Sequence, residues 1–150
     1  MTMITHLLCE YRANPLGIDV TAPRLSWRLQ SDRAGARQTA YRILAASDPA
    51  RLQAGQADLW DSGKVESDQS VHVAYAGPRL GSRQRVYWQV TGWDETGQAS
   101  QSEVAWFEIG LLERSDWKAR WIGAALTGGP RTNVPAPYLR KPFSLADGVE

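Results

Sequence analysis

A chain of 150 residues is long enough for one ordinary domain, and a second complete domain would be cramped. Hydrophobic residues make up 43% of the chain and charged residues 22%, which is the balance of a folded globular protein rather than a disordered one. A net charge of +1, without a dense basic cluster, predicts that neither nucleic acid nor an anionic membrane is a partner.

The single cysteine, Cys9, excludes a disulfide within the chain, so the fold must be held by packing alone. Residues 1–8 have no basic region and no apolar core of signal-peptide length. No stretch approaches the roughly 20 apolar residues that a membrane helix needs. We therefore expect a soluble, cytoplasmic protein.

Short runs rich in Trp, Tyr, Val and Thr alternate with turns rich in Gly, Pro, Asn and Asp, which is typical of β structure. Seven strands are predicted, at Leu8–Tyr11, Arg24–Leu29, Gln38–Ala46, Leu59–Ser62, Ser67–Tyr75, Arg85–Asp94 and Val104–Ile109. Seven strands in about a hundred residues predict an all-β, immunoglobulin-like or fibronectin-type-III-like sandwich.

Two of these strands are the clearest. Arg85–Asp94 alternates apolar and polar residues with a period of two, and Gln38–Ala46 is apolar on both sides, as in a central strand. The best helix candidate is about two turns long, with Asp48 as its N-cap, Pro49 at its first position and Gly55 as its stop.

The sequence pattern changes after Gly110, where a segment rich in Gly and Pro follows the predicted strands. We therefore divide the chain into a sandwich at 1–110, a linker at 111–137 and the start of a truncated second β domain at 138–150. Tyr138–Leu145 has strand character, but one strand cannot bury a face by itself. Left unpaired, this C-terminal strand would be a site for self-association.

Two pairs of carboxylates are close in sequence, and a pair of carboxyl groups can act as a general acid and its partner in hydrolysis. These pairs are Asp58 with Asp61 and Asp94 with Glu95. Each pair stands beside a turn, where short carboxylates bond the local backbone. We interpret all four as turn residues and predict that this chain has no catalytic residue.

His6, His72 and Cys9 are too few and too scattered for a zinc site. No phosphate loop or metalloprotease motif is present. We predict neither a metal nor a cofactor, with both histidines at the surface and Cys9 half-buried in a strand.

Seven tryptophans are many for 150 residues, and sugar-binding modules use exposed aromatic rings as platforms. The candidates for such a platform are Trp60, Tyr87 and Trp93. Trp27, Trp88 and Trp106 instead share strand register with core residues. Trp117 and Trp121 are expected to pack at the junction with the following domain.

Several short blocks of sequence follow one another along the chain: Glu10–Ile18, Pro23–Trp27, Gln38–Ile43, Leu59–Val65, Tyr87–Val90, Trp93–Asp94, Phe107–Leu112, Trp117–Gly123 and Pro137–Phe143. Taken in this order, they resemble the N-terminal domain of bacterial α-L-rhamnosidases. Those enzymes are large glycoside hydrolases that begin with a fibronectin-like domain. Their catalytic acidic residues lie in a downstream helical barrel, and no position here corresponds to them.

The resemblance implies a non-catalytic N-terminal accessory module of an enzyme that removes terminal α-L-rhamnose, with the downstream domains of the same polypeptide as its partners. Two alternatives stay open. One is an autonomous carbohydrate-binding module that recognises rhamnose-containing glycosides. The other is a fibronectin-like protein-interaction module that uses an exposed sheet edge.

Overall fold

The computed structural model describes residues 2–123, 125 and 135–144. Eight strands and one α-helix lie in these residues. They are β1 (Thr2–Cys9), β2 (Arg24–Ser31), β3 (Gln38–Ala46), α1 (Pro49–Gln53), β4 (Trp60–Asp61), β5 (Val73–Ala74), β6 (Arg85–Asp94), β7 (Ala99–Gln101) and β8 (Ala105–Glu108). A 3₁₀ turn, η1 (Arg114–Asp116), follows β8.

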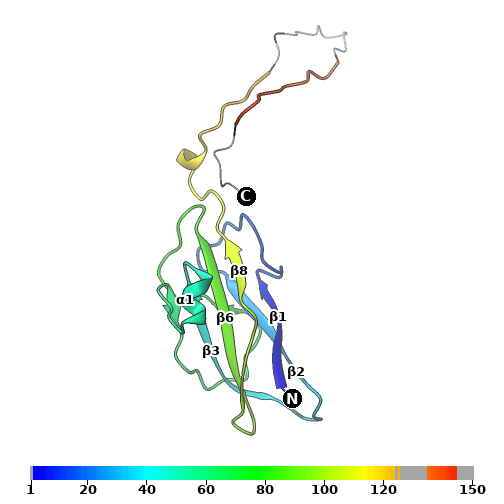
Figure 1. Ribbon diagram of the computed structural model, residues 1–150, viewed down its shortest axis with the longest axis vertical. Helices are drawn as coiled ribbons and strands as arrows, with labels where there is room; N and C mark the ends of the chain where they lie inside the picture. Colours follow the sequence, from blue (N-terminus) through cyan, green and yellow to red (C-terminus); the bar gives the residue numbers. More distant parts are fainter. Residues whose placement is uncertain (1, 124, 126–134, 145–150) are drawn as a thin grey trace. The chain divides into compact units, whose positions relative to one another are not determined.

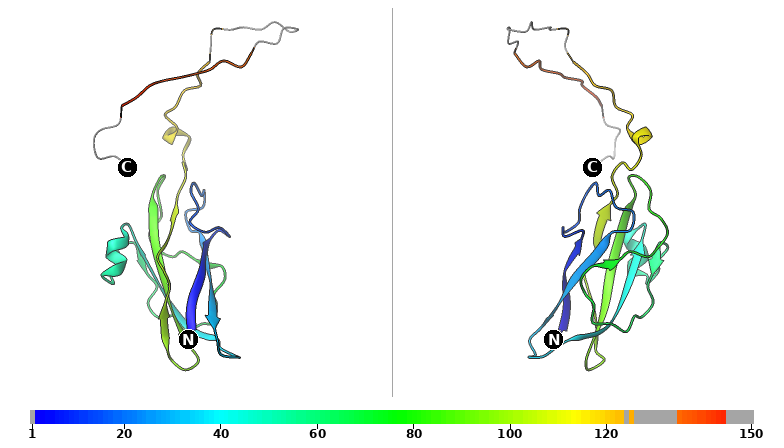
Figure 2. Two further views of the ribbon diagram at one scale, coloured as in Figure 1. Left: turned by 45° about the vertical axis from the view of Figure 1, so that its right-hand side comes forward. Right: turned by 180° about the vertical axis from the view of Figure 1, so that it is seen from behind.

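The strands form two antiparallel sheets that face each other as a sandwich (Figures 1 and 2). One sheet has three strands in the order β1-β2-β5. The other has five, in the order β4-β3-β6-β7, with β8 also pairing with β6. The predicted all-β sandwich is confirmed, although the described chain has one strand more than the seven expected.

Strand β6 is the centre of the larger sheet and has the predicted bounds, 85–94. Val86, Trp88 and Val90 are buried between the sheets, and the residues that alternate with them are only half-buried. β3 pairs with β6 along most of its length and is flanked by β4 on its other side, as expected of a central strand.

The core between the sheets is built around Trp27, Trp88 and Phe107, each 2% exposed or less. The indole Nε1 of Trp27 donates to Gln38 Oε1 at 2.8 Å, so the polar atom of this buried ring is satisfied. The Trp27 ring also meets Tyr41 edge to face, at 5.2 Å between centroids.

A second, smaller cluster lies on the outer face of the larger sheet, beneath α1. Asp48 caps the helix as predicted, because its carboxylate accepts the backbone N–H of Ala50 at 2.8 Å. Leu52 is the buried residue of the helix, and it packs with Leu44 and Ala46 of β3.

Three expectations about strand bounds were wrong. β1 begins at Thr2 rather than Leu8, and a bulge between Thr5 and Leu8 interrupts its pairing with β2. Only Val73–Ala74 of the expected strand at 67–75 pairs with another strand. Residues 138–144, expected to be a strand, form none, and Leu145 lies outside the described residues.

The chain divides into two units, Met1–Trp117 and Lys118–Glu150. The sandwich and η1 both belong to the first unit. Within the described ranges there is no helix with the length and apolar character required to cross a bilayer.

Candidate functional site

The segment that leaves the sandwich after β8 is fastened to the turn before β6, and Ser82 is the centre of this attachment. Its hydroxyl accepts the backbone N–H of Leu112 at 2.9 Å and donates to the carboxylate of Asp116 in a short hydrogen bond. The same carboxylate accepts the N–H of Glu113 at 3.0 Å, which closes the turn of η1. We call the Ser82–Asp116 interaction and its backbone partners the exit clamp.

Arg83 strengthens the exit clamp from the neighbouring position. Its backbone N–H lies 3.0 Å from the carbonyl oxygen of Ile109 and 3.1 Å from that of Gly110, and its guanidinium donates to the carbonyl of Asp116 at 3.0 Å. Its φ of 62° turns the backbone so that these bonds can form. The chain is therefore held against the sandwich as far as η1, which lies within the predicted linker at 111–137.

The free edge of β8 is covered by the segment 14–18. Asn14 accepts the backbone N–H of Trp106 through its side-chain oxygen at 2.9 Å, and the carbonyl of Pro15 accepts the N–H of Glu108 at 3.0 Å. Ile18 continues the pairing through its own N–H and carbonyl. This cover removes an edge on which another chain could pair.

Close backbone contact explains Gly110, which lies two residues after the end of β8. A Cβ atom added at Gly110 would lie 3.1 Å from the carbonyl oxygen of Gly17, a tighter approach than side chains normally make. Gly17 itself has a φ of +69°, which favours glycine. Both glycines thus serve the junction between the 14–18 cover and the exit segment.

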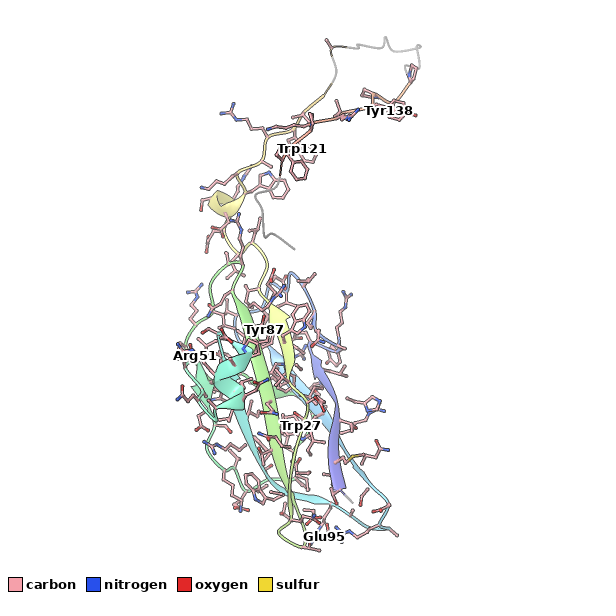
Figure 3. All side chains as sticks on the ribbon, viewed as in Figure 1. Trp27, Arg51, Tyr87, Glu95, Trp121 and Tyr138 are labelled. Atoms are coloured by element: carbon pink, nitrogen blue, oxygen red, sulfur yellow. The ribbon has the colours of Figure 1, made fainter. Side chains whose placement is uncertain are left out.

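Large apolar side chains are concentrated on the surface of the chain after Gly110. Of the twelve exposed large hydrophobic residues among those described, seven follow Gly110: Leu111, Trp117, Trp121, Ile122, Tyr138, Leu139 and Phe143. Trp121 is 97% exposed, and Tyr138 is fully exposed (Figure 3). Exposed apolar groups at this density are typical of a surface that another surface covers.

The three aromatic residues proposed as a sugar platform do not share one surface. Trp60 pairs with Ala45 on the inner face of the larger sheet and meets Tyr75 edge to face at 5.2 Å. Tyr87 and Trp93 are on the outer face, but six residues apart on β6, or about 20 Å. The structure brings no two of them together.

Other contacts already occupy the two outer-face rings. Tyr87 packs against the cluster beneath α1 (Figure 3), and the ammonium of Lys64 lies 5.1 Å from the centroid of the Trp93 ring. Trp106, expected in the core, is also on the outer face. It is half-buried beneath the guanidinium of Arg85, 4.5 Å from its ring centroid, because β8 turns Phe107 inward instead.

The four carboxylates considered for catalysis are all engaged in local bonds. Asp61 forms two hydrogen bonds with the Arg42 guanidinium, at 2.9 and 2.6 Å, and accepts the N–H of Gly63, as expected of a turn residue. Asp58 accepts both the hydroxyl and the N–H of Ser47. These bonds lower the pKa of both carboxyls, through Arg42 for Asp61 and through the Ser47 hydroxyl for Asp58.

Asp94 is buried and accepts hydrogen bonds from several segments. They come from the hydroxyl and N–H of Thr96, the Thr2 hydroxyl and the Arg33 guanidinium, at 2.6 to 3.1 Å. The Thr96 hydroxyl is the largest cause of a pKa lowered to about 2. Glu95 also has a lowered pKa, mainly through the N–H of Arg37. A general acid of a glycosidase needs a raised pKa, and these four carboxyls have the opposite.

The cysteine and the two histidines do not form a reactive or metal-binding site. Cys9 is 1% exposed, more deeply buried than expected, and burial raises the pKa of its thiol to about 12, which leaves it unreactive. His6 and His72 are at the surface, as predicted. The described residues include no group of three side chains able to hold a metal ion.

Two facing antiparallel sheets with a tryptophan-rich core define an immunoglobulin-like β-sandwich. Residues 4–113 match the family described as Rha78A-like, N-terminal immunoglobulin domain. The chain belongs to this family.

The relatives are much longer proteins. The α-L-rhamnosidase of Streptomyces avermitilis is 46% identical over 134 residues, which are 89% of this chain and 12% of that protein. An α-L-rhamnosidase of Formosa agariphila is 44% identical over 143 residues, covering 91% of this chain and 15% of that protein. The chain thus spans about an eighth to a seventh of the length of these relatives.

Solved structures give the same result. The S. avermitilis α-L-rhamnosidase complexed with L-rhamnose matches with a TM-score of 0.77 and 47% identity, over 83% of this chain and 12% of that one. The α-L-rhamnosidase from Dictyoglumus thermophilum matches with a TM-score of 0.75 and 35% identity, over 82% of this chain and 14% of that one.

Proposed function

We propose that this chain is the non-catalytic N-terminal module of an α-L-rhamnosidase-like glycoside hydrolase, and that it packs against the downstream domains of the same polypeptide. The observations that carry the proposal are the family match over residues 4–113 and the alignment of this chain with 12 to 15% of the length of two α-L-rhamnosidases. The chemistry of the parent protein would then reside in the remaining part of its chain.

The state of the carboxylates supports the non-catalytic role. Asp58, Asp61, Asp94 and Glu95 have lowered pKa values and are held by hydrogen bonds within the sandwich. An acid with this environment is ionised at neutral pH and has no proton to give to a leaving group. Hydrolysis of a rhamnoside by these groups is therefore not expected.

The exposed aromatic residues after Gly110 support the packing role. Residues 1–113 are about three quarters of the chain, whereas the Formosa relative aligns with 91% of it, so the likeness extends past Glu113 into this segment. Trp117, Trp121 and Tyr138 would be covered by the downstream domains. The exit clamp supports the same role, because it fixes the path by which the chain leaves the sandwich.

Binding of rhamnose-containing glycosides by this chain alone has less support. Trp60 is turned toward the core, and Lys64 lies over the Trp93 ring, so the residues predicted for a platform have other contacts. Self-association through a C-terminal strand also has less support, because residues 138–144 form no strand.

The test is hydrolysis of p-nitrophenyl α-L-rhamnoside by the 150-residue chain and by a polypeptide extended with the downstream domains of a relative. We expect release of nitrophenol by the extended protein only. Release by the 150-residue chain would overturn the non-catalytic assignment. Inactivity of a folded extended protein would overturn the assignment to a rhamnosidase.

A further inference from the structure

The turn after β1 has an unusual composition for its geometry. The N–H and carbonyl of Cys9 both bond to those of Arg12, at 2.9 and 3.0 Å, and the two central residues have positive φ, 46° for Glu10 and 69° for Tyr11. A turn of this type strongly favours Asn-Gly, and a bulky residue at positive φ is strained. Backbone strain of this kind is often found at functional sites, so we ask what the side chains of Glu10 and Tyr11 contact.

Arg24 holds both of these side chains. Its guanidinium makes two hydrogen bonds to the Glu10 carboxylate, at 2.7 and 3.2 Å, and lies 5.1 Å from the centroid of the Tyr11 ring. Tyr11 also meets the ring of His72 edge to face at 5.1 Å. The Tyr11 ring is therefore fixed in place although it is 63% exposed.

Both histidines of the chain have the same backbone conformation as Tyr11, with φ of 52° for His6 and 57° for His72. His6 lies in the bulge of β1, and the N–H of His72 bonds to the hydroxyl of Ser26 at 3.0 Å. All three residues line one cavity on the smaller sheet. Three left-handed, non-glycine residues around one cavity are a concentration of strain of the kind found at binding sites.

The cavity has a volume of about 170 Å³, below the roughly 300 to 1,000 Å³ of sites for drug-sized ligands. It is close to the cavity of about 150 Å³ that accepts benzene, so its size fits a single six-membered ring. Leu8, Val71 and the Tyr11 ring supply apolar surface on which such a ring can lie.

The polar part of the lining is cationic or donates hydrogen bonds. Arg28 lines the cavity with His6 and His72, and no carboxylate is among the lining residues. Within the described residues the Arg28 guanidinium makes no hydrogen bond or ion pair. An unpaired guanidinium beside two imidazoles matches a carboxylate, which Arg can bind through two parallel hydrogen bonds.

We propose that this cavity binds a single-ring carboxylate, with the carboxylate on Arg28 and the ring against Tyr11 and Val71. Hexuronic acids and aromatic acids share this chemistry. The site is independent of the proposed function, since it lies on the smaller sheet and uses none of the residues after Gly110.

The experiment is a titration of the ¹⁵N-labelled 150-residue chain with glucuronate, benzoate and glucose, followed by amide chemical shifts. We expect saturable shifts at Arg28, Val71 and His72 with glucuronate, benzoate or both, and none with glucose. Which acid binds identifies the ligand's ring. Equal binding of glucose, or no saturable shift with either acid, would overturn the proposal.

Two variants and one control locate the site. Arg28→Gln should weaken binding at least roughly tenfold, because a charge-assisted hydrogen bond is lost. Tyr11→Gly should also weaken it while the turn is retained, since glycine suits a positive φ. Arg79→Gln, at an exposed arginine outside the cavity, should leave binding unchanged. Unchanged binding by folded Arg28→Gln protein would contradict the assignment.

Discussion

The sandwich and the segment that follows it differ in where their large apolar side chains lie. In the sandwich, Trp27 and Trp88 are enclosed between two sheets, and the free edge of β8 is covered by residues 14–18. In the second unit, Trp121 and Tyr138 are exposed to solvent. The first unit therefore buries its largest apolar side chains within itself, whereas the second has apolar groups suited to contacts that the chain itself does not supply.

The largest effect is expected from a core tryptophan of the first unit. Trp27→Ala removes a 2%-exposed indole and leaves Gln38 without the hydrogen bond it accepts. The free energy of unfolding should fall by about 3 to 5 kcal/mol. Urea denaturation followed by circular dichroism measures the loss. A loss below about 1 kcal/mol would show that the core is not arranged around this ring.

A smaller effect is expected from Asp94, which joins β1, the loop at Arg33 and the turn at Thr96. Asp94→Asn should lower the melting temperature at pH 7, because a buried carboxylate loses charge-assisted hydrogen bonds. The folded pKa of about 2 is below the ordinary value of 3.8, so the ionised carboxylate stabilises the fold above pH 3.8.

That stabilisation is lost as the pH falls from about 4 through about 2. The difference in melting temperature between wild type and Asp94→Asn should therefore shrink over this range. Thermal unfolding at a series of pH values measures this difference. The contributions of the other carboxylates are the same in both proteins and cancel when the two are compared. A difference that stays constant down to pH 2 would contradict a role for the charge.

The next largest effect is expected from a substitution in the exit clamp, which lies close to the boundary between the two units. Ser82→Ala removes the hydroxyl that bonds Leu112 and Asp116, at a cost of about 1 kcal/mol, confined mostly to local opening of 109–117. Trypsin should cut after Arg114 faster in this variant. Ser70→Ala serves as the control, and equal cutting rates in the two variants would mean that the clamp does not hold the segment.

The smallest effect on stability is expected in the second unit. Trp121→Ala should change the free energy of unfolding of the 150-residue chain by less than about 0.5 kcal/mol, because this side chain is 97% exposed. The same substitution in the extended polypeptide should be clearly destabilising. Urea denaturation of both pairs of proteins makes the comparison, and equal effects in the two would contradict the interdomain role.

Elements with a strong local pattern could be predicted from sequence. β6 has the predicted bounds because apolar and polar residues alternate along it, and Asp48 followed by Pro49 predicted the start of α1. β7, Ala99–Gln101, was missed because its Ala-Ser-Gln sequence has no apolar period and its pairing with β6 decides its structure. Trp106 was assigned to the wrong face of its strand. It is next to Phe107 in a strand of four residues, so the alternation of side chains does not show which of the two aromatic rings faces the core.

The candidate site depended more on long-range contacts. Exposed tryptophans after Gly110 were expected at a junction, and they are exposed in the structure. The exit clamp joins residues 34 positions apart through small polar side chains, which carry no local signal. The cavity on the smaller sheet likewise brings together the bulge at His6, the turn at Tyr11 and His72. No periodic pattern of apolar residues predicts a positive φ at such positions.

The most direct test of the interdomain account is thiol labelling of Ile122→Cys. Cys9 is buried and has a pKa of about 12, so the new cysteine would be the reactive thiol of the 150-residue chain. Ala54→Cys, exposed after α1, is the matched control. We predict rapid labelling at 122 in the 150-residue chain and much slower labelling in the extended polypeptide, with no change at 54. Equally rapid labelling at 122 in both proteins would show that the downstream domains do not cover this segment.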